Sequence, residues 1–367
     1  MYHGNKTGVP VKAAWENEKK TWCLRLAPLS RLLATTLSST AWRNASSVLA
    51  SDPPLPLPSG RPSLQRFNMR NPYILVALVF AGTAALPQAQ TPAALRNANG
   101  LQLLVASENT QPVLRIVVPG IPHAQRAIEV LFPEHVTVQK HGSADSRHLY
   151  LYRPGNQGNP IAWRQAGQAL QYEKDFPDGI HLLARATLQS DGVLFHYELE
   201  NHSDTSYDMA TAITDPRLMS VFHDVRLERT YVHTQNGFEL LASETPARLT
   251  MPLKQWLPDR YMASYTWPVP AHLVERRNDG ITYYSRSRPV DEPLIATVSE
   301  DHQWVVASFT RTTGNVWSNP ELTCQHVDQY VPLPPQGKAV LEVKILILRG
   351  SLDEVLKKVV AQRFELD

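Results

Sequence analysis

Cysteine is scarce in this sequence of 367 residues, which contains only Cys23 and Cys324. They lie in parts of the chain that we expect processing to separate, so a framework of disulfides is not expected. The sequence also lacks a large excess of charge of either sign, because the formal net charge is only +2. A nucleic-acid-binding protein normally carries a concentrated basic face, and none is visible, which argues against that class of partner.

Acidic residues are almost missing between positions 19 and 103, where Asp52 is the only one. The stretch from Pro53 to Pro62 is too rich in proline for a helix or a central strand. We therefore expect residues 1–68 to form no folded domain. Two interpretations of this segment stay open: translation starts at Met69, or the segment is a genuine extension with the composition of an organelle transit peptide.

A short apolar run from Tyr73 to Leu86 follows Met69 and a basic residue, and small residues near Ala89 follow the run. This is the layout of a secretory signal peptide, and the run is too short to span a membrane comfortably. We therefore expect residues 69–89 to be a signal peptide. Residues 90–367 should then form one domain of a protein exported to the periplasm or out of the cell, with no membrane span in the mature chain.

The clearest structural signal is a predicted β-hairpin. Apolar residues alternate with polar ones from Ile180 to Gln189 and again from Val193 to Glu200, which is the period of a strand with one buried face. Asp191-Gly192 joins the two runs, and we expect the glycine to take the positive φ of a tight turn. The side chains expected to face the core in the second run are Val193, Phe195, Tyr197 and Leu199.

Further short strand-like runs fill the rest of residues 90–367, and they do not alternate with long helices. This pattern favours an all-β fold, a large antiparallel β-sandwich, over α/β architectures. One helix is expected at the C-terminus, where Ser351 and Glu354 form a capping box and an apolar stripe should pack on the sheet edge. Besides the hairpin, the expected strands are 101–105, 113–118, 135–139, 147–152, 168–173, 228–233, 238–242, 281–285, 294–299, 304–310 and 339–348.

Two stretches resemble the galactose-mutarotase-like supersandwich of aldose epimerases. They are LFHYELENHSDTSYDMATAITDPRL, residues 194–218, and VPLPPQGKAVLEVKILIL, residues 331–348. The resemblance implies a supersandwich that acts on a saccharide or polysaccharide. Epimerases of this family place a catalytic histidine before a proline, and here Asp215 precedes Pro216. The resemblance therefore makes Asp215 a candidate for acid–base catalysis, and the alternative is that Asp215 only begins a turn.

A second candidate group lies on the predicted strand that begins at Glu228. Alternation places Arg229, Tyr231 and His233 on one face. An arginine that binds a carboxylate, with Tyr231 and His233 to move protons, would suit a lyase that acts on uronic acids. An ordinary solvated strand face explains the same pattern.

Sugar binding needs flat aromatic faces and planar polar groups that meet hydroxyls in pairs. The segment Trp317-Ser318-Asn319-Pro320 offers both, and Arg311 and Arg229 add guanidinium groups. We therefore expect Trp317, Asn319, Arg311 and Arg229 to bind the substrate, unless the aromatic residues only fill the core. Other aromatic residues that could contribute are Trp267, Tyr283, Tyr284 and Trp304.

A metal site is a further possibility. Cys324, His326 and Asp328 share one face if this stretch is extended, and thiolate, imidazole and carboxylate are all zinc ligands. The alternatives are a buried cysteine beside a hydrogen-bonded histidine, or a cysteine nucleophile activated by the imidazole. No cofactor is expected otherwise. The whole pattern predicts a protein that recognises or processes carbohydrate, and the alternatives are a non-catalytic glycan-binding module and a structural envelope protein.

Overall fold

Strands make up most of the chain in the computed structural model, which describes residues 94–106, 111–121, 127–151, 161–244, 259–264, 274–276, 282–320 and 323–367. All of these residues belong to one compact unit. Every strand pair in the described residues is antiparallel except β15 with β17. No described helix is long and apolar enough to cross a membrane. The all-β antiparallel sandwich expected from the sequence is confirmed.

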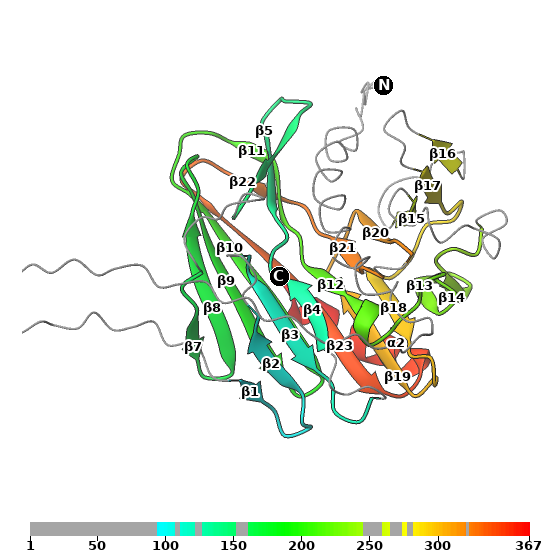
Figure 1. The fold of residues 1–367 in the computed structure, drawn as a ribbon. Helices are drawn as coiled ribbons and strands as arrows, with labels where there is room; N and C mark the ends of the chain where they lie inside the picture. The colour runs from blue at the N-terminus through cyan, green and yellow to red at the C-terminus, as the bar shows by residue number, and fades with distance from the viewer. Residues whose placement is uncertain are drawn as a thin grey trace, which may run out of the picture. The chain divides into compact units, whose positions relative to one another are not determined.

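A nine-stranded sheet forms the centre of the fold (Figure 1). The predicted hairpin supplies two of its inner strands, because β10 pairs with β9 on one side and with the long strand β23 on the other. In sheet order the strands are β14 (Gly237–Leu240), β13 (Thr230–Thr234), β18 (Leu294–Val298), β19 (Trp304–Phe309), β23 (Lys338–Arg349), β10 (Gly192–Asn201), β9 (Ile180–Gln189), β8 (Ala169–Asp175) and β7 (Arg164–Ala166).

Three smaller sheets complete the described β-structure. The first contains β1 (Leu95–Arg96), β2 (Gln102–Val105), β3 (Val113–Val117), β4 (Ala127–Leu131) and β12 (Asp215–Arg217). The second contains β22 (Val331–Leu333), β11 (Tyr207–Ala212), β5 (Val136–Lys140) and β6 (Ser146–Leu149). The third contains β16 (Val274–Arg276), β17 (Thr282–Ser285), β15 (Asp259–Ser264), β20 (Asn315–Ser318) and β21 (His326–Asp328).

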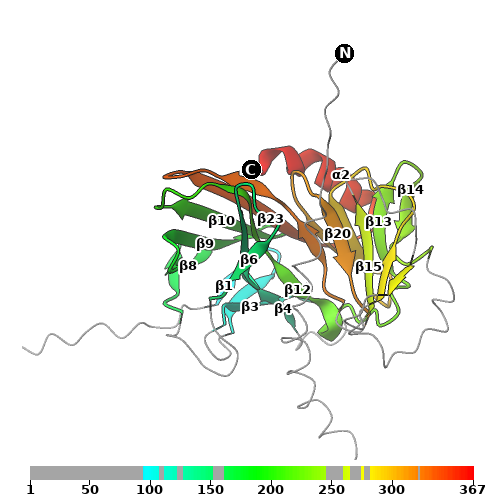
Figure 2. The same cartoon turned by 90° about the horizontal axis from the view of Figure 1, so that it is seen from above.

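The large sheet is buried on one face along the hairpin strands β9 and β10 and on both faces over β18, β19 and most of β23. On one face, Phe195 and Ile345 pack with the first two small sheets, and Ile295 packs with β15, β20 and β21. On the other face, Leu346 and Phe309 pack against the C-terminal helix. Figure 2 shows this helix on one side of β10 and β23, with β3 and β4 on the other side. The side chains expected to be buried along the second hairpin strand are each 0% exposed, namely Val193, Phe195, Tyr197 and Leu199.

The helix α2 (Leu352–Gln362) begins as predicted. The Ser351 side chain accepts a hydrogen bond from the Glu354 backbone, and the Glu354 side chain accepts one from the Ser351 backbone. The helix packs on the face of the inner strands β18 and β19 rather than on the sheet edge, because Val355 and Val359 meet the apolar residues of that face. Two 3₁₀ turns complete the described helical structure, η1 (Leu218–Ser220) and η4 (Arg363–Glu365).

The hairpin turn needs its glycine for a reason other than the expected one. Gly192 is absent from the residues with positive φ and lies within β10. A Cβ atom at this position would come within 2.0 Å of the Ile345 carbonyl oxygen on β23. Gly192 therefore permits the close approach of two backbones. A positive φ is found instead at Gly237, the first residue of β14, where φ is 96° and the chain turns back from β13.

Candidate functional site

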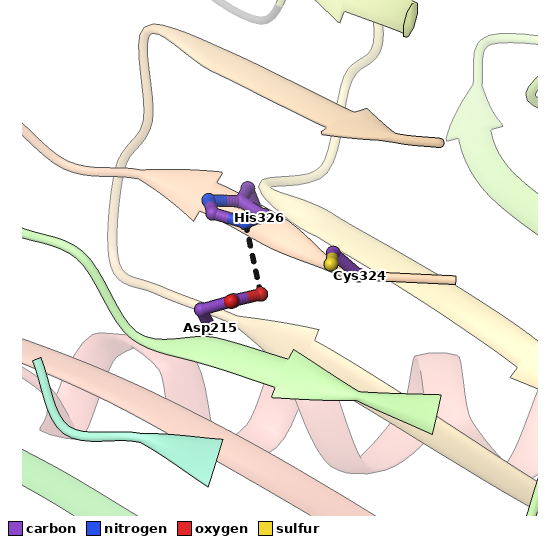
Figure 3. Close-up of side chains that lie close together, drawn as sticks. All are labelled: Asp215, Cys324 and His326. Atoms are coloured by element: carbon purple, nitrogen blue, oxygen red, sulfur yellow. Dashed lines mark hydrogen bonds and ion pairs between the residues drawn. The ribbon is translucent and has the colours of Figure 1, made fainter. Parts of the chain in front are cut away.

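Asp215, Cys324 and His326 come together from two distant segments (Figure 3). Asp215 begins β12, and the residues before β21 run beside this strand, because Arg217 forms an isolated antiparallel bridge with Cys324. The Nε2 atom of His326 lies 3.1 Å from Oδ1 of Asp215, although the two residues are 111 positions apart. The three groups are buried, and their ligand-type atoms all lie within 4.8 Å of one another.

His326 lies between two carboxylates. Its Nδ1 atom is 3.8 Å from Oδ1 of Asp328, and the indole Nε1 of Trp317 donates to the other Asp328 oxygen at 3.1 Å. Trp317 and His326 lie opposite each other on β20 and β21, and their rings stack with centroids 3.8 Å apart. Carboxylates therefore lie near both ring nitrogens, and an indole covers one face of the ring.

Arg217 and Glu134 form the more exposed edge of this group. The Nε atom of Arg217 is 3.4 Å from Oδ2 of Asp215, and the Arg217 side chain is 29% exposed, whereas that of Asp215 is 4% exposed. The Glu134 side chain is 20% exposed, and its charge acts on both Arg217 and Cys324. We call Glu134, Asp215, Arg217, Cys324 and His326 the Asp215 cluster.

The charges of the cluster follow from burial and pairing. Burial alone raises the pKa of Asp215, but the hydrogen bond to His326 and the charges of His326 and Arg217 bring that pKa well below its ordinary value. Burial, followed by the negative charge of Asp215, raises the pKa of the Cys324 thiol far above its ordinary value. At neutral pH the cluster therefore contains an ionised Asp215 and a protonated thiol.

Two buried histidines lie beside the exposed edge. The Thr137 hydroxyl is 3.1 Å from Nδ1 of His135 and 2.6 Å from Nδ1 of His148. A hydroxyl has one hydrogen, so it can donate to only one of these nitrogens and must accept from the other. The Nδ1 atom of one imidazole therefore carries a proton, and the Nδ1 atom of the other does not. His135 connects the pair to the Asp215 cluster, because its Nε2 lies 4.0 Å from a Glu134 oxygen.

The structure separates Tyr231 and His233 from Asp215. Tyr231 packs with the residues that contact α2, and His233 contacts Asp291 at 2.7 Å. The neighbouring residue Thr230 faces the other side of the sheet, where its hydroxyl contacts that of Thr297. Gln325, next to His326, donates to the same Thr297 hydroxyl. The large sheet therefore lies between the two groups of predicted catalytic residues.

The predicted substrate-binding residues do not form one site in the described residues. Trp317 is 7% exposed, and the Arg260 guanidinium lies 5.7 Å from its ring. Asn319 is 2% exposed. Arg229 donates to the backbone oxygens of Val298 and His223, whereas Arg311 donates to that of Leu366 near the C-terminus.

The other aromatic residues named from the sequence do not add a binding surface in the described residues. Tyr284 stacks on Tyr261, and Trp304 packs on the main core. Tyr283 is described only as part of β17, and Trp267 lies outside the described residues.

Glu134 and Arg217 were not among the residues predicted from the sequence. Arg217 stands two positions after Asp215, and strand alternation alone could have placed their side chains on one face. Glu134 gave no such signal, because its position depends on the pairing of distant segments. Its backbone nitrogen donates to the carbonyl of Ile213, two residues before Asp215.

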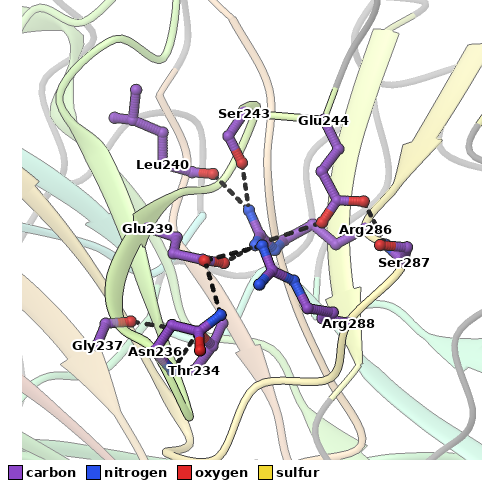
Figure 4. Close-up of polar contacts among 10 residues, drawn as sticks. All are labelled: Thr234, Asn236, Gly237, Glu239, Leu240, Ser243, Glu244, Arg286, Ser287 and Arg288. Atoms are coloured by element: carbon purple, nitrogen blue, oxygen red, sulfur yellow. Dashed lines mark hydrogen bonds and ion pairs between the residues drawn. The ribbon is translucent and has the colours of Figure 1, made fainter.

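A second buried charge group holds loops together (Figure 4). Arg286 is 1% exposed, and its guanidinium donates to the Leu240 carbonyl, the Ser243 hydroxyl and the Glu239 carboxylate. Glu244 lies 3.4 Å from the same guanidinium. These contacts join the end of β14 to the residue after β17. These contacts satisfy an arginine that is almost fully buried, so we interpret the group as structural.

Comparisons with known proteins show a weak and partial resemblance to galactose-mutarotase-like proteins. A galactose mutarotase related enzyme from Lactobacillus acidophilus is 10% identical, with 71% of this chain and 98% of that chain covered and a TM-score of 0.39. A GalM/aldose epimerase homologue from C. elegans is 9% identical, with 70% of this chain and 98% of that chain covered and a TM-score of 0.41. An alpha-N-acetylgalactosaminidase from Bifidobacterium bifidum is 10% identical, with 75% of this chain and 39% of that chain covered and a TM-score of 0.43. No family model and no curated protein matches the chain.

Proposed function

We propose that this chain is an exported protein that recognises or processes a saccharide at the Asp215 cluster. The observation that carries the proposal is the convergence of three segments on five chemically active side chains, three of them almost fully buried. Burying charge costs free energy that apolar packing would not. A buried group of charges with an exposed edge is therefore a candidate functional site.

The exposed edge has the chemistry that sugar hydroxyls require. A guanidinium donates hydrogen bonds in a planar fork, and a carboxylate accepts them, so Arg217 and Glu134 together can meet neighbouring hydroxyls of one ring. Asp215 is ionised and contacts Arg217, and we assign it the role of positioning that arginine. Glu134 is the candidate for proton transfer, because it is the carboxylate at the exposed edge.

A non-catalytic glycan-binding protein is the second candidate. It is favoured by the environment of His326, since carboxylates lie near both ring nitrogens and neither nitrogen is placed to exchange a proton with a ligand at the edge. In this case Arg217 and Glu134 bind the sugar and no bond is broken. Measured turnover separates the two functions.

Binding is tested by thermal unfolding of the full chain with a panel of neutral and uronic saccharides. A ligand present at about 100 times its dissociation constant should stabilise the protein by about 2.7 kcal/mol. We expect one class of saccharide to raise the melting temperature, and Arg217→Gln to abolish the rise. The matched control is Arg164→Gln, because Arg164 is 57% exposed and, within the described residues, forms an ion pair only with Glu173 on β8. This variant should keep the rise.

Turnover is tested with the saccharide that binds, by following its anomeric and linkage signals with NMR. We expect wild type to change these signals and Glu134→Gln to lose at least tenfold in rate while it still binds. Binding without any change in the sugar would favour the glycan-binding alternative. If no saccharide in the panel shifts the melting temperature or is converted, the proposal is wrong.

A further inference from the structure

We propose that Asp215, Cys324 and His326 bind a divalent transition-metal ion of the zinc type. The three side chains offer a carboxylate oxygen, a thiol sulfur and an imidazole nitrogen within 4.8 Å of one another. Protein zinc sites use these three ligand types, with bond lengths of about 2.0 to 2.3 Å. An ion between the three atoms would need only small movements of the side chains. This inference does not depend on the proposed function, because a metal can bind whether or not a sugar does.

Asp328 provides a second, independent observation. A histidine that binds a metal through one nitrogen usually has a carboxylate or carbonyl near the other, which fixes the ring orientation. Here Nε2 of His326 faces Asp215, and Nδ1 lies 3.8 Å from Asp328. Trp317 in turn holds Asp328 through its indole nitrogen. Asp328 was expected to be a ligand, and the geometry instead assigns it the role of orienting His326.

Charge balance supports a divalent ion. Cys324 gives up its thiol proton to solvent when the sulfur binds the metal. His326 gives up the Nε2 proton that faces the ionised Asp215, and the neutral ring that binds the metal carries its proton on Nδ1, the nitrogen near Asp328. Carboxylate, thiolate and neutral imidazole then carry two negative charges against the two positive charges of the ion. The contact between Asp215 and His326 is replaced by two bonds to the metal. No oxidation or reduction takes place in this exchange.

Arg217 competes with the metal. The Nε atom of Arg217 lies 3.4 Å from Oδ2 of Asp215, an oxygen of the carboxylate that would bind the ion. A fixed positive charge at this distance repels a cation and occupies one of its ligands. Removal of this charge should therefore strengthen metal binding, whereas the proposed saccharide site needs the same arginine. Arg217→Gln thus has opposite expected effects on the two ligands.

The experiment uses the full chain after dialysis against a chelator, titrated with Co²⁺, which substitutes for Zn²⁺ and reports its ligands by absorbance. We expect one ion per chain, a thiolate-to-cobalt charge-transfer band, and loss of the band when Zn²⁺ is added. Cys324→Ser should lose the band, while Cys23→Ser, which removes the other cysteine of the sequence, should keep it. Circular dichroism checks that each variant is folded.

Quantitative outcomes test the individual roles. We expect His326→Gln and Asp215→Asn to weaken Zn²⁺ binding at least tenfold, and Asp328→Asn to weaken it about 10- to 100-fold, as outer carboxylates do. Arg217→Gln should bind Zn²⁺ more tightly than wild type. Absence of a charge-transfer band in wild type overturns the site, as does a band that depends on Cys23 instead of Cys324. Metal binding without any saccharide effect would leave this inference standing and remove only the proposed function.

Discussion

Asp215 shows at the scale of one residue why a buried charge depends on its partners. Its carboxylate is 3.1 Å from His326 and 3.4 Å from Arg217. Removing one partner of a buried pair leaves the other charge without compensation, which typically costs about 3–5 kcal/mol. The contacts of Asp215 are therefore expected to be among the larger single contributions to the stability of the chain.

We predict that Asp215→Asn lowers the free energy of unfolding by about 3–5 kcal/mol at neutral pH, since His326 and Arg217 would then face a neutral amide. Urea denaturation of the chelator-treated protein measures this change and keeps metal binding out of it. Asp145→Asn is the control, because Asp145 is exposed and no described residue forms a hydrogen bond with its carboxylate. A change in Asp215→Asn no larger than in Asp145→Asn would show that the buried pair is not formed.

Three residues of this cluster could be predicted singly but not as a group. Asp215, Cys324 and His326 each drew attention for their chemistry, and alternation was expected to place Cys324, His326 and Asp328 on one face. Alternation applies only within a regular strand, and β21 begins at His326. Thr323, just before Cys324, has a φ of 46°, which interrupts the extended backbone. The partner across 111 residues could not be deduced from local spacing.

At the scale of the element, Asp191 joins the central hairpin to the C-terminal helix. Its carboxylate contacts Lys344 on β23 at 2.8 Å, Lys358 on α2 at 3.1 Å and Gln362 on α2 at 2.9 Å. Burial raises the pKa of Asp191, but these three partners outweigh it and lower the pKa to about 2. The turn residue of the hairpin therefore helps to hold α2 against the sheet.

This lowered pKa predicts a pH dependence of stability. The pKa of Asp191 in the folded state lies below the value in the unfolded chain, about 3.9, so its ionised form adds stability above about pH 4. That contribution is lost as the pH falls from about 4 to about 2. We expect Asp191→Asn to cost about 1–2 kcal/mol at pH 7, after allowance for solvent screening.

The measurement is the difference in unfolding free energy between wild type and Asp191→Asn at several pH values. It should narrow below pH 4 and nearly vanish at about pH 2. Asp145→Asn again serves as the control, and its difference from wild type should stay near zero at every pH. A difference for Asp191→Asn that is unchanged between pH 7 and pH 2 would contradict the ion-pair explanation.

At the scale of the element, alternation made the central hairpin the clearest strand signal, and some short strands with no alternation were not expected. The strands β9 and β10 alternate buried and partly exposed residues along nearly their whole length, so period two was visible in the sequence. All four residues of β20 are buried, as are five of the six in β11. Such strands show no alternation, and neither was among the expected strands, whereas β18, whose five residues are all buried, was expected as residues 294–299. The Ser351 capping box predicted the start of α2, because its hydrogen bonds are local.

At the scale of the whole molecule, composition and strand spacing gave the class but could not give the order of strands. The sheet places β23 between β10 and β19, and it places β13 next to β18. These neighbours are separated by long stretches of sequence, and local propensity contains no information about such pairings. The small third sheet and the strand β12 beside β4 follow from the same long-range choices. The site at β12 and β21 was therefore unpredictable for the same reason as the topology.

The N-terminal layout predicts how the chain is processed. An apolar run from Tyr73 to Leu86 with small residues after it predicts cleavage near Ala89. The first described strand, β1, begins at Leu95, so this cleavage would leave every described strand in the mature chain.

We expect a bacterial host that expresses the full sequence to export a product whose N-terminus lies near Gln90. Intact mass and the N-terminal peptide would show this. Leu78→Arg places a charge inside the apolar run and should keep the chain unprocessed inside the cell. An exported product that retains any peptide from residues 1–68 would contradict both the signal-peptide assignment and the proposed start of the mature chain.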